Sequence, residues 1–259
     1  MLGTIFNPIK DFTIQILLQL YQLTGNLGIA IIVLTLLIRF LLVPLSLGSL
    51  RSQKKIQDLK PELDKLKKLH GKDKAKFQQA QMELYKKYNI NPLSGCLPYL
   101  VQIVLLIVLY QVLHQFISQT EINGIAINPM FAWLDLSKPD PLHILPILAG
   151  VSQFILSLMI SPGAEVTDIV PNDSKKKEVQ KANEKEEDFA EMAAGMQKQM
   201  LFMMPIMTGF IAWRFQSGLA LYWVVTTAFS AGQQYFISGF GGLVSYWKLA
   251  VSKVNSFKK

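Results

Sequence analysis

The chain has 259 residues, of which 51% are hydrophobic, and a formal net charge of +8 at pH 7. Its apolar residues stand in long blocks, which excludes an ordinary soluble domain and a disordered chain. Blocks of this length that lack the alternating period of a barrel wall indicate membrane-spanning helices. The sequence therefore predicts an all-α membrane protein with several spans.

The predicted elements run from an N-terminal helix through five spans to a basic tail. At 7–24, apolar residues recur at helical spacing opposite Asp11 and three glutamines. This pattern predicts an amphipathic helix at the outer interface, with an ordinary packed helix as the alternative. The spans are predicted at 27–50, 96–117, 142–161, 199–215 and 219–237, with loops at 51–91, 118–141 and 162–198 and a tail at 238–259.

The first long loop is strongly basic, with twelve Lys/Arg against five Asp/Glu between residues 51 and 88. The positive-inside rule places this loop and the lysine-bearing tail in the cytoplasm, and hence the N-terminus outside. Leucines at helical spacing lead up to the sequence His70-Gly71-Lys72-Asp73, and a second apolar pattern follows it. These patterns predict an antiparallel helical hairpin, with a solvated charged linker as the alternative.

The second cytoplasmic loop, 162–198, is too polar to bury a core. Near its end, methionines begin to recur at close to every fourth residue, from Met192 to Met207. Because methionine adapts its shape, this segment favours a surface that meets varied apolar partners, or else gap filling between helices.

Polar side chains form stripes inside the predicted spans. Given the direction of each span, they fall in the middle or cytoplasmic part of the membrane, which predicts a hydrophilic groove open to the cytoplasm and closed outside. The alternatives are that Arg39 reaches the cytoplasmic headgroups and that the glutamines only join neighbouring helices. The candidate groove residues are Arg39, Thr35, Ser46, Gln102, Gln153, Ser157, Trp223, Thr226, Ser230 and Gln233.

The sequence lacks the common motifs of hydrolases, zinc proteases and nucleotide-binding loops, and the five predicted spans contain no Asp or Glu. An enzyme, a metal site and a cofactor are therefore not expected. A proton-driven transporter would lack its usual intramembrane acid. The single cysteine, Cys96, excludes an internal disulfide.

Four segments carry a resemblance to a known family: "IRFLLVPL", "NINPLSGCLPYLVQ", "DPLHILPILAGVSQF" and "MLFMMPIMTGFIAWRFQSGLALYWVVT". Their order and spacing resemble those of the YidC/Oxa/Alb membrane protein insertases over about residues 7–237. The resemblance implies five core spans, a cytoplasmic hairpin and a groove with a single arginine, whose place Arg39 takes. Trp223 matches the groove aromatic of the "LYW" motif, and Gln153 corresponds approximately.

The resemblance also implies a source and partners. It indicates a multi-pass protein of the bacterial plasma membrane, of minimal form, without the large outer domain of Gram-negative members or the lipoprotein signal of Gram-positive ones. The expected partners are nascent membrane proteins, the ribosome, the lipid bilayer and the Sec translocon, with no specific nucleic-acid sequence.

The predicted function is insertion, and assistance in folding, of newly made membrane proteins through the groove. Two other classes remain open on the residues alone. One is an ion channel or small-solute transporter, which would need polar lining in the outer half of the membrane. The other is a structural assembly factor without insertion activity.

Overall fold

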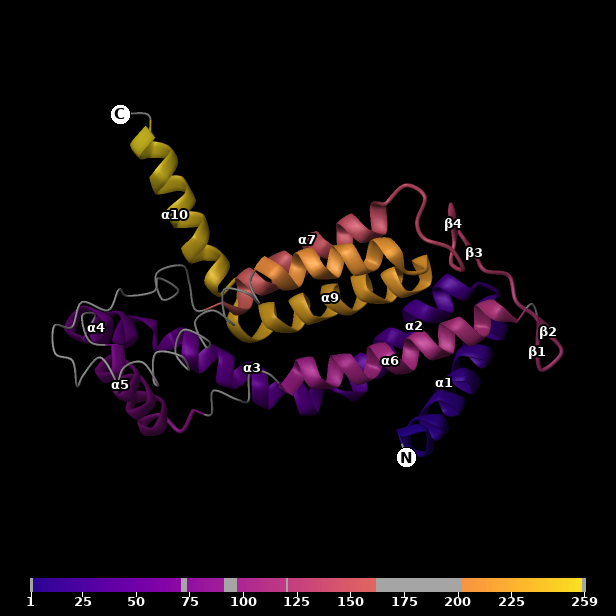
Figure 1. Ribbon diagram of the computed structural model, residues 1–259, viewed down its shortest axis with the longest axis horizontal. Helices are drawn as coiled ribbons and strands as arrows, with labels where there is room; N and C mark the ends of the chain where they lie inside the picture. Colours follow the sequence, from indigo (N-terminus) through magenta and orange to yellow (C-terminus); the bar gives the residue numbers. More distant parts are fainter. Residues whose placement is uncertain (1, 71–73, 91–96, 120, 162–201, 258–259) are drawn as a thin grey trace, which may run out of the picture. The chain divides into compact units, whose positions relative to one another are not determined.

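The computed structural model of the protein describes residues 2–70, 74–90, 97–119, 121–161 and 202–257 (Figure 1). Most of these residues are helical, in agreement with the all-α prediction. The helices are α1 (Leu2–Thr24), α2 (Leu27–Leu41), α3 (Val43–Asp58), α4 (Lys60–His70), α5 (Lys74–Lys87), α6 (Leu97–Ser118), α7 (Ile144–Ile160), an unlabelled helix at 202–214, α9 (Ser217–Ser238) and α10 (Gly242–Phe257).

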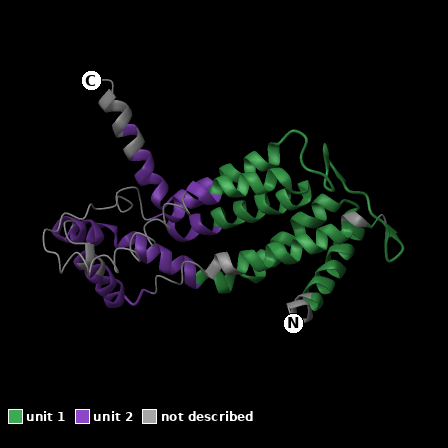
Figure 2. Cartoon of the chain, viewed as in Figure 1, with its two compact units in different colours: residues 1–47, 96–153, 205–232 green, residues 48–95, 154–204, 233–259 purple. Residues whose placement is uncertain are grey.

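The chain divides into two compact units (Figure 2). Unit 1 comprises residues 1–47, 96–153 and 205–232, and unit 2 comprises residues 48–95, 154–204 and 233–259. Helices α3, α7 and α9 contribute residues to both units. The predicted loop at 162–198, and Met192, Met196 and Met200 of the methionine series, lie outside the described residues.

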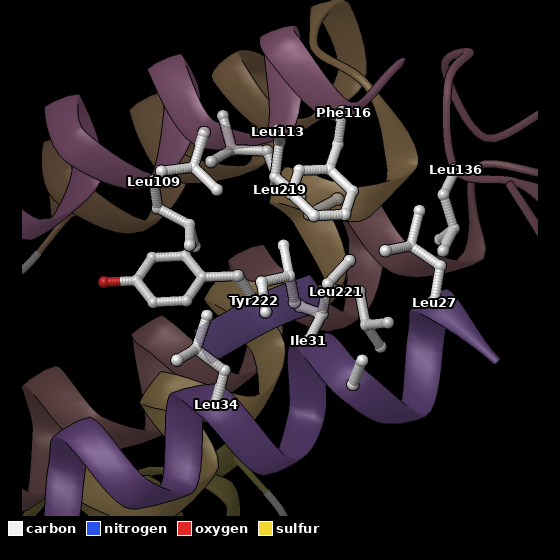
Figure 3. Close-up of a cluster of buried hydrophobic side chains, with 14 of the residues drawn as sticks. Leu27, Ile31, Leu34, Leu109, Leu113, Phe116, Leu136, Leu219, Leu221 and Tyr222 are labelled. Carbon is white, nitrogen blue, oxygen red and sulfur yellow. The ribbon is translucent and has the colours of Figure 1, made fainter. Parts of the chain in front are cut away.

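The core of unit 1 is apolar and joins α2, α6 and α9 (Figure 3). Spacings of three and four residues place the buried α2 side chains on one face of the helix. Close packing gives each of these side chains many weak dispersion contacts, which together hold the helices in a fixed rotation. The labelled core residues are Leu27, Ile31 and Leu34 of α2, Leu109, Leu113 and Phe116 of α6, Leu219, Leu221 and Tyr222 of α9, and Leu136.

Helix α1 packs into this core along one face, where Ile14, Leu17 and Tyr21 are buried. Ile9 and Phe12, by contrast, are exposed. The predicted range 7–24 lies within α1, which begins five residues earlier, at Leu2. The location of this helix at the outer membrane interface stays a prediction.

The predicted first span, 27–50, is not one straight helix. Helix α2 ends at Leu41 and α3 begins at Val43, with Pro44 in its first turn. Proline lacks the N–H that would continue the α2 hydrogen-bond ladder, and its ring crowds the preceding turn. No single helix among the described residues is long and apolar enough to cross a membrane. Helices α2 and α3 reach the required length and composition only as a pair, and the two are bent by 66° relative to each other.

Two short antiparallel hairpins lie within the segment predicted as the loop 118–141. Strand β1 (Glu121–Ile122) pairs with β2 (Ile125–Ala126), and β3 (Met130–Phe131) pairs with β4 (Leu134–Asp135). The first turn is Asn123-Gly124, and both residues have positive φ, as a tight hairpin turn requires.

Polar contacts anchor this segment to the helices. The Tyr21 hydroxyl of α1 accepts a hydrogen bond from the Asn128 backbone N–H at 2.9 Å and donates to the Ala126 carbonyl at 3.3 Å. At the start of α9, the Ser217 hydroxyl donates to the Lys138 carbonyl at 2.6 Å. The segment is therefore fixed against both α1 and α9.

In unit 2, α4 and α5 form a packed antiparallel pair. The Tyr88 hydroxyl, just after α5, donates to the Glu62 carboxylate near the start of α4 at 2.7 Å. Of the leucines at helical spacing that predicted this hairpin, Leu59 and Leu63 are buried, whereas Leu69 is exposed. Few buried apolar side chains therefore hold α4 and α5 together.

The start of α7 depends on a buried carboxylate. Asp140 is 2% exposed, and its two oxygens accept hydrogen bonds from the backbone N–H groups of Leu142 at 3.0 Å and Leu145 at 2.8 Å. The first N–H groups of a helix have no partner within the helix, and an anion there also meets the positive end of the helix dipole. Asp140 therefore fixes where α7 begins.

Replacing Asp140 with Ala should lower the free energy of unfolding by about 1–2 kcal/mol, the usual cost of a lost N-terminal cap. The thermal midpoint of the purified protein in detergent, followed by circular dichroism, measures this loss. Glu121→Ala, at an exposed carboxylate, is the matched control and should leave the midpoint unchanged. Equal midpoints for the two variants would contradict the assigned role of Asp140.

Candidate functional site

Arg39 lies in the last turn of α2, where it meets polar side chains from two other helices of unit 1. Its Nε donates to Thr226 Oγ1 of α9 at 3.1 Å, and its Nη2 donates to Gln102 Oε1 of α6. The Gln102 Nε2 in turn donates to the Tyr222 hydroxyl at 3.2 Å. A continuous polar chain therefore links α2, α6 and α9.

The apolar core sets the positions of these groups. Tyr222 and Thr226 are four residues apart on α9 and so share a face of that helix. Figure 3 shows the Tyr222 ring between Leu34 of α2 and Leu109 of α6. The same packing that buries the ring thus places its hydroxyl within reach of Gln102.

The charge of Arg39 has no carboxylate partner within the described residues. Helices α2, α6 and α9 contain no Asp or Glu, and the acceptors that hold the guanidinium are a neutral amide and a neutral hydroxyl. Tyr222 of α9, whose hydroxyl is also neutral, lies against the guanidinium as well. The site therefore keeps its positive charge.

Hydrogen bonds to a charged group contribute about 1.5–3 kcal/mol each. Two such bonds are comparable with the roughly 2.5–3.5 kcal/mol that an arginine costs at the centre of an inserted helix. Thr226 and Gln102 can therefore hold Arg39 in an apolar helix without neutralising it. In the described part of the chain, no group of His, Cys, Asp and Glu is placed to hold a metal ion.

The structure brings three of the sequence-predicted residues together: Arg39, Gln102 and Thr226. Thr35 is buried one turn before Arg39, but its hydroxyl donates to the Ile31 carbonyl of its own helix at 2.6 Å. Ser230 likewise donates to the Thr226 carbonyl one turn back, at 2.9 Å. Trp223 is buried in the apolar core of unit 1.

Ser46, another candidate groove residue, lies on a different helix from Arg39, and its place in the groove stays a prediction. Ser46 lies in α3, beyond the bend at Leu42, and its hydroxyl donates to the Val43 carbonyl at 3.0 Å. Pro44 is the physical reason, because it ends the α2 ladder and begins a helix of different direction.

The remaining candidates keep their status as predictions. Gln153 is buried in α7 within unit 1. Ser157 and Gln233 belong to unit 2, so their grouping with Arg39 stays a prediction. Within unit 2, Gln234 is fully buried, whereas its neighbour Gln233 is partly exposed.

Tyr222 is the site residue that the sequence prediction missed. Its hydroxyl binds Gln102, and the residue lies one turn before Thr226. The spacing could have indicated this role, since Tyr222 precedes the predicted groove residue Thr226 by four positions and so lies on the same helix face. A tyrosine inside an apolar block is more often a core residue, and nothing in the pattern separates the two roles.

Replacing Gln102 with Leu should remove both the acceptor of Arg39 and the donor to Tyr222. Leaving a charged group without one partner costs about 1–3 kcal/mol, so the thermal midpoint in detergent should fall. Gln111→Leu, at an exposed position on the same helix, is the matched control and should leave the midpoint unchanged. The chain of hydrogen bonds would be refuted if Gln102→Leu were as stable as this control.

Comparison with known proteins places the chain in a family. The sequence model of the family described as "60Kd inner membrane protein" matches residues 19–241. A "Membrane protein insertase YidC" of Fusobacterium nucleatum is 34% identical over 233 residues, which cover 90% of this chain and 96% of that protein. Another, from Ectopseudomonas mendocina, is 38% identical over 220 residues, or 85% of this chain and 32% of that protein.

A solved structure has a similar fold. The crystal structure of an active YidC insertase with its first transmembrane domain resolved has a TM-score of 0.59 and 23% sequence identity. The match covers 90% of this chain and 46% of that one. This chain thus spans nearly the whole of the Fusobacterium relative but only about a third to a half of the larger proteins. The protein therefore belongs to the 60Kd inner membrane protein family, the family of these YidC insertases of bacterial membranes.

Proposed function

We propose that this protein is a membrane protein insertase, which moves the hydrophilic end of a newly made membrane protein across the bilayer while its apolar segment enters lipid. The observation that carries the proposal is the arrangement at Arg39, a positive charge held by neutral acceptors between three apolar helices. The names of the two similar proteins support it.

Exposed apolar side chains support a location within the membrane. In unit 1, Ile147 and Val151 of α7 and Ile206, Phe210 and Trp213 of the helix at 202–214 are each at least half exposed. Such large apolar faces are unfavourable in water and fit a lipid environment. We infer five spans with the N-terminus outside and the C-terminus in the cytoplasm, with the basic segments on the inner side.

The proposed role of Arg39 is to attract acidic residues of the arriving segment. A carboxylate about 4 Å from the guanidinium gains on the order of 4 kcal/mol at an effective dielectric of about 20. Thr226 and Gln102 hold the guanidinium without neutralising it, so its charge can attract a carboxylate of the arriving segment. A groove open to the cytoplasm would shorten the apolar path that the polar end must cross.

The energy of insertion comes from the substrate and the membrane. Burial of the substrate's own apolar helix supplies most of the driving force, so a nucleotide site is not required. The membrane potential adds about 2.3 kcal/mol per charge at 100 mV and draws acidic ends outward.

Two further surfaces have proposed roles. The α4 and α5 pair receives the nascent chain or its ribosome in the cytoplasm, and the Sec translocon is a further partner. The third and fifth spans, with the methionine-rich segment, form the surface from which the substrate reaches lipid. Met203 and Met207 of that segment are exposed, at 53% and 48%, which suits contact with varied apolar chains.

Replacing Arg39 with Ala should slow insertion of a single-span substrate with an acidic translocated end by about tenfold or more, since an ion pair of a few kcal/mol is lost. Protease protection measures insertion into vesicles that hold the purified protein and no other translocase. The same substrate with its acidic residues changed to Asn or Gln is the control and should be little affected. If Arg39→Ala inserted the acidic substrate at the wild-type rate, the charge-attraction role would be excluded.

This reconstitution also separates the competing functions. A structural assembly factor would give no insertion in the absence of another translocase. An ion channel would give ion flux through the same vesicles without substrate.

Replacing residues 60–87 with a short Gly/Ser linker removes α4 and α5 but keeps Gln57 of α3. We expect insertion to fall while the thermal midpoint of the remaining helices stays near the wild-type value, because α4 and α5 bury little apolar surface. Tyr88→Phe, which removes only the exposed bond to Glu62, is the control and should insert normally. Full insertion activity without residues 60–87 would remove the pair from the mechanism.

A further inference from the structure

Helix α10 begins in a fixed position at the end of α7, within unit 2. A Cβ atom at Gly242 would come within 2.7 Å of the Leu158 carbonyl oxygen, and one at Gly241 would clash with the Met159 carbonyl. The hydroxyls of Ser161 and Tyr246 form a hydrogen bond of 3.2 Å. Only glycine, which has no Cβ, allows the backbone of the first turn of α10 to lie this close to the last turn of α7.

Gln57 of α3 completes this junction. Its Nε2 donates to the carbonyls of Met159 and Ile160, each at 2.8 Å. The last carbonyls of a helix need partners outside it, and Gln57 supplies them for α7. Because α7 is a proposed span, its end marks the membrane surface, and α10 begins at that level.

Beyond this junction, α10 presents an apolar face that no described helix of its unit covers. Val244, Trp247 and Val251 follow at spacings of three and four, so they lie on one side of the helix. Their exposed fractions are 43%, 71% and 42%. Figure 1 shows α10 extending from the end of α9 without another described helix of unit 2 beside it.

The charge of this segment is entirely positive. Residues 238–259 contain Lys248, Lys253, Lys258 and Lys259 and neither Asp nor Glu. Lys248 is exposed and lies directly after Trp247. A helix with tryptophan and valine on one side, and with lysines and no acid, has the composition of helices that lie in a membrane interface.

We propose that α10 binds the surface of an anionic phospholipid leaflet, with Val244, Trp247 and Val251 between the headgroups and Lys248 at the lipid phosphates. The inference rests on the proposed membrane placement of α7 and α9. Nucleic acid would satisfy the lysines but would leave the exposed valines in water, so the apolar face favours lipid. Binding at this surface would orient the inner end of α7 through the junction with Gln57.

Spin labels on the full-length protein in lipid nanodiscs test this proposal. In a Cys96→Ser background, single cysteines replace Val251 on the apolar face, Ser245 on another face of α10, and Ile147 on the exposed face of α7. Collisions with oxygen and with a water-soluble nickel chelate report whether each label lies in lipid or in water. The nanodiscs contain either phosphatidylcholine alone or phosphatidylcholine with phosphatidylglycerol.

We expect the Ile147 label to report lipid and the Ser245 label to report water in both kinds of nanodisc. The Val251 label should report lipid when phosphatidylglycerol is present and shift toward water when it is absent. Changing the four lysines to glutamine should abolish that difference, since each lysine near an anionic surface strengthens partitioning roughly fivefold.

Three results would overturn the proposal. A Val251 label that reports water in anionic nanodiscs, beside an Ile147 label in lipid, refutes the role of α10 and leaves the proposed function standing. A Val251 label that stays in water but is immobilised by added ribosomal RNA identifies a nucleic-acid surface instead. An Ile147 label that reports water overturns the membrane placement as well.

Discussion

The hydrogen bonding of one unneutralised guanidinium is the constraint on which the rest of the site depends. Arg39 can remain charged among apolar helices because Thr226 and Gln102 accept its N–H groups without cancelling its charge. Gln102 is itself oriented by Tyr222, whose ring packs in the apolar core. The core and the polar site therefore determine one another, since a shift of α6 or α9 that loosened the core would also remove a partner of Arg39.

Residue type alone was enough to predict some residues of the polar site but not others. A charged or amide side chain in a leucine-rich block is rare and costly, so Arg39 and Gln102 stand out without any structure. Tyr222 does not, because tyrosine packs readily in apolar cores. Ser46 lies on a different helix from Arg39 because the chain bends by 66° between α2 and α3, and the pattern of residue types does not contain that angle. Gln233 and Gln234 are adjacent, and helix packing, which the pattern does not contain, decides that Gln234 is the buried one.

The two proposals assign positive charges to two different environments of the same membrane. At Arg39 a positive charge lies among apolar helices, where it can act on a passing carboxylate at low dielectric. At α10 positive charges lie beside exposed apolar side chains, where a negatively charged lipid surface can bind both. Gln57 links the ends of α3 and α7, so the segment that leads to α4 and the segment that leads to α10 share one junction within unit 2.

A charge-reversal experiment tests the central claim about Arg39 most directly. Wild type and Arg39→Glu would be reconstituted without a membrane potential and given two single-span substrates that differ only in acidic or lysine residues in the translocated end. If the charge acts on the passing segment, wild type favours the acidic substrate and Arg39→Glu favours the lysine substrate. The same order of preference in both proteins, or equal loss of both substrates in Arg39→Glu, would contradict the account.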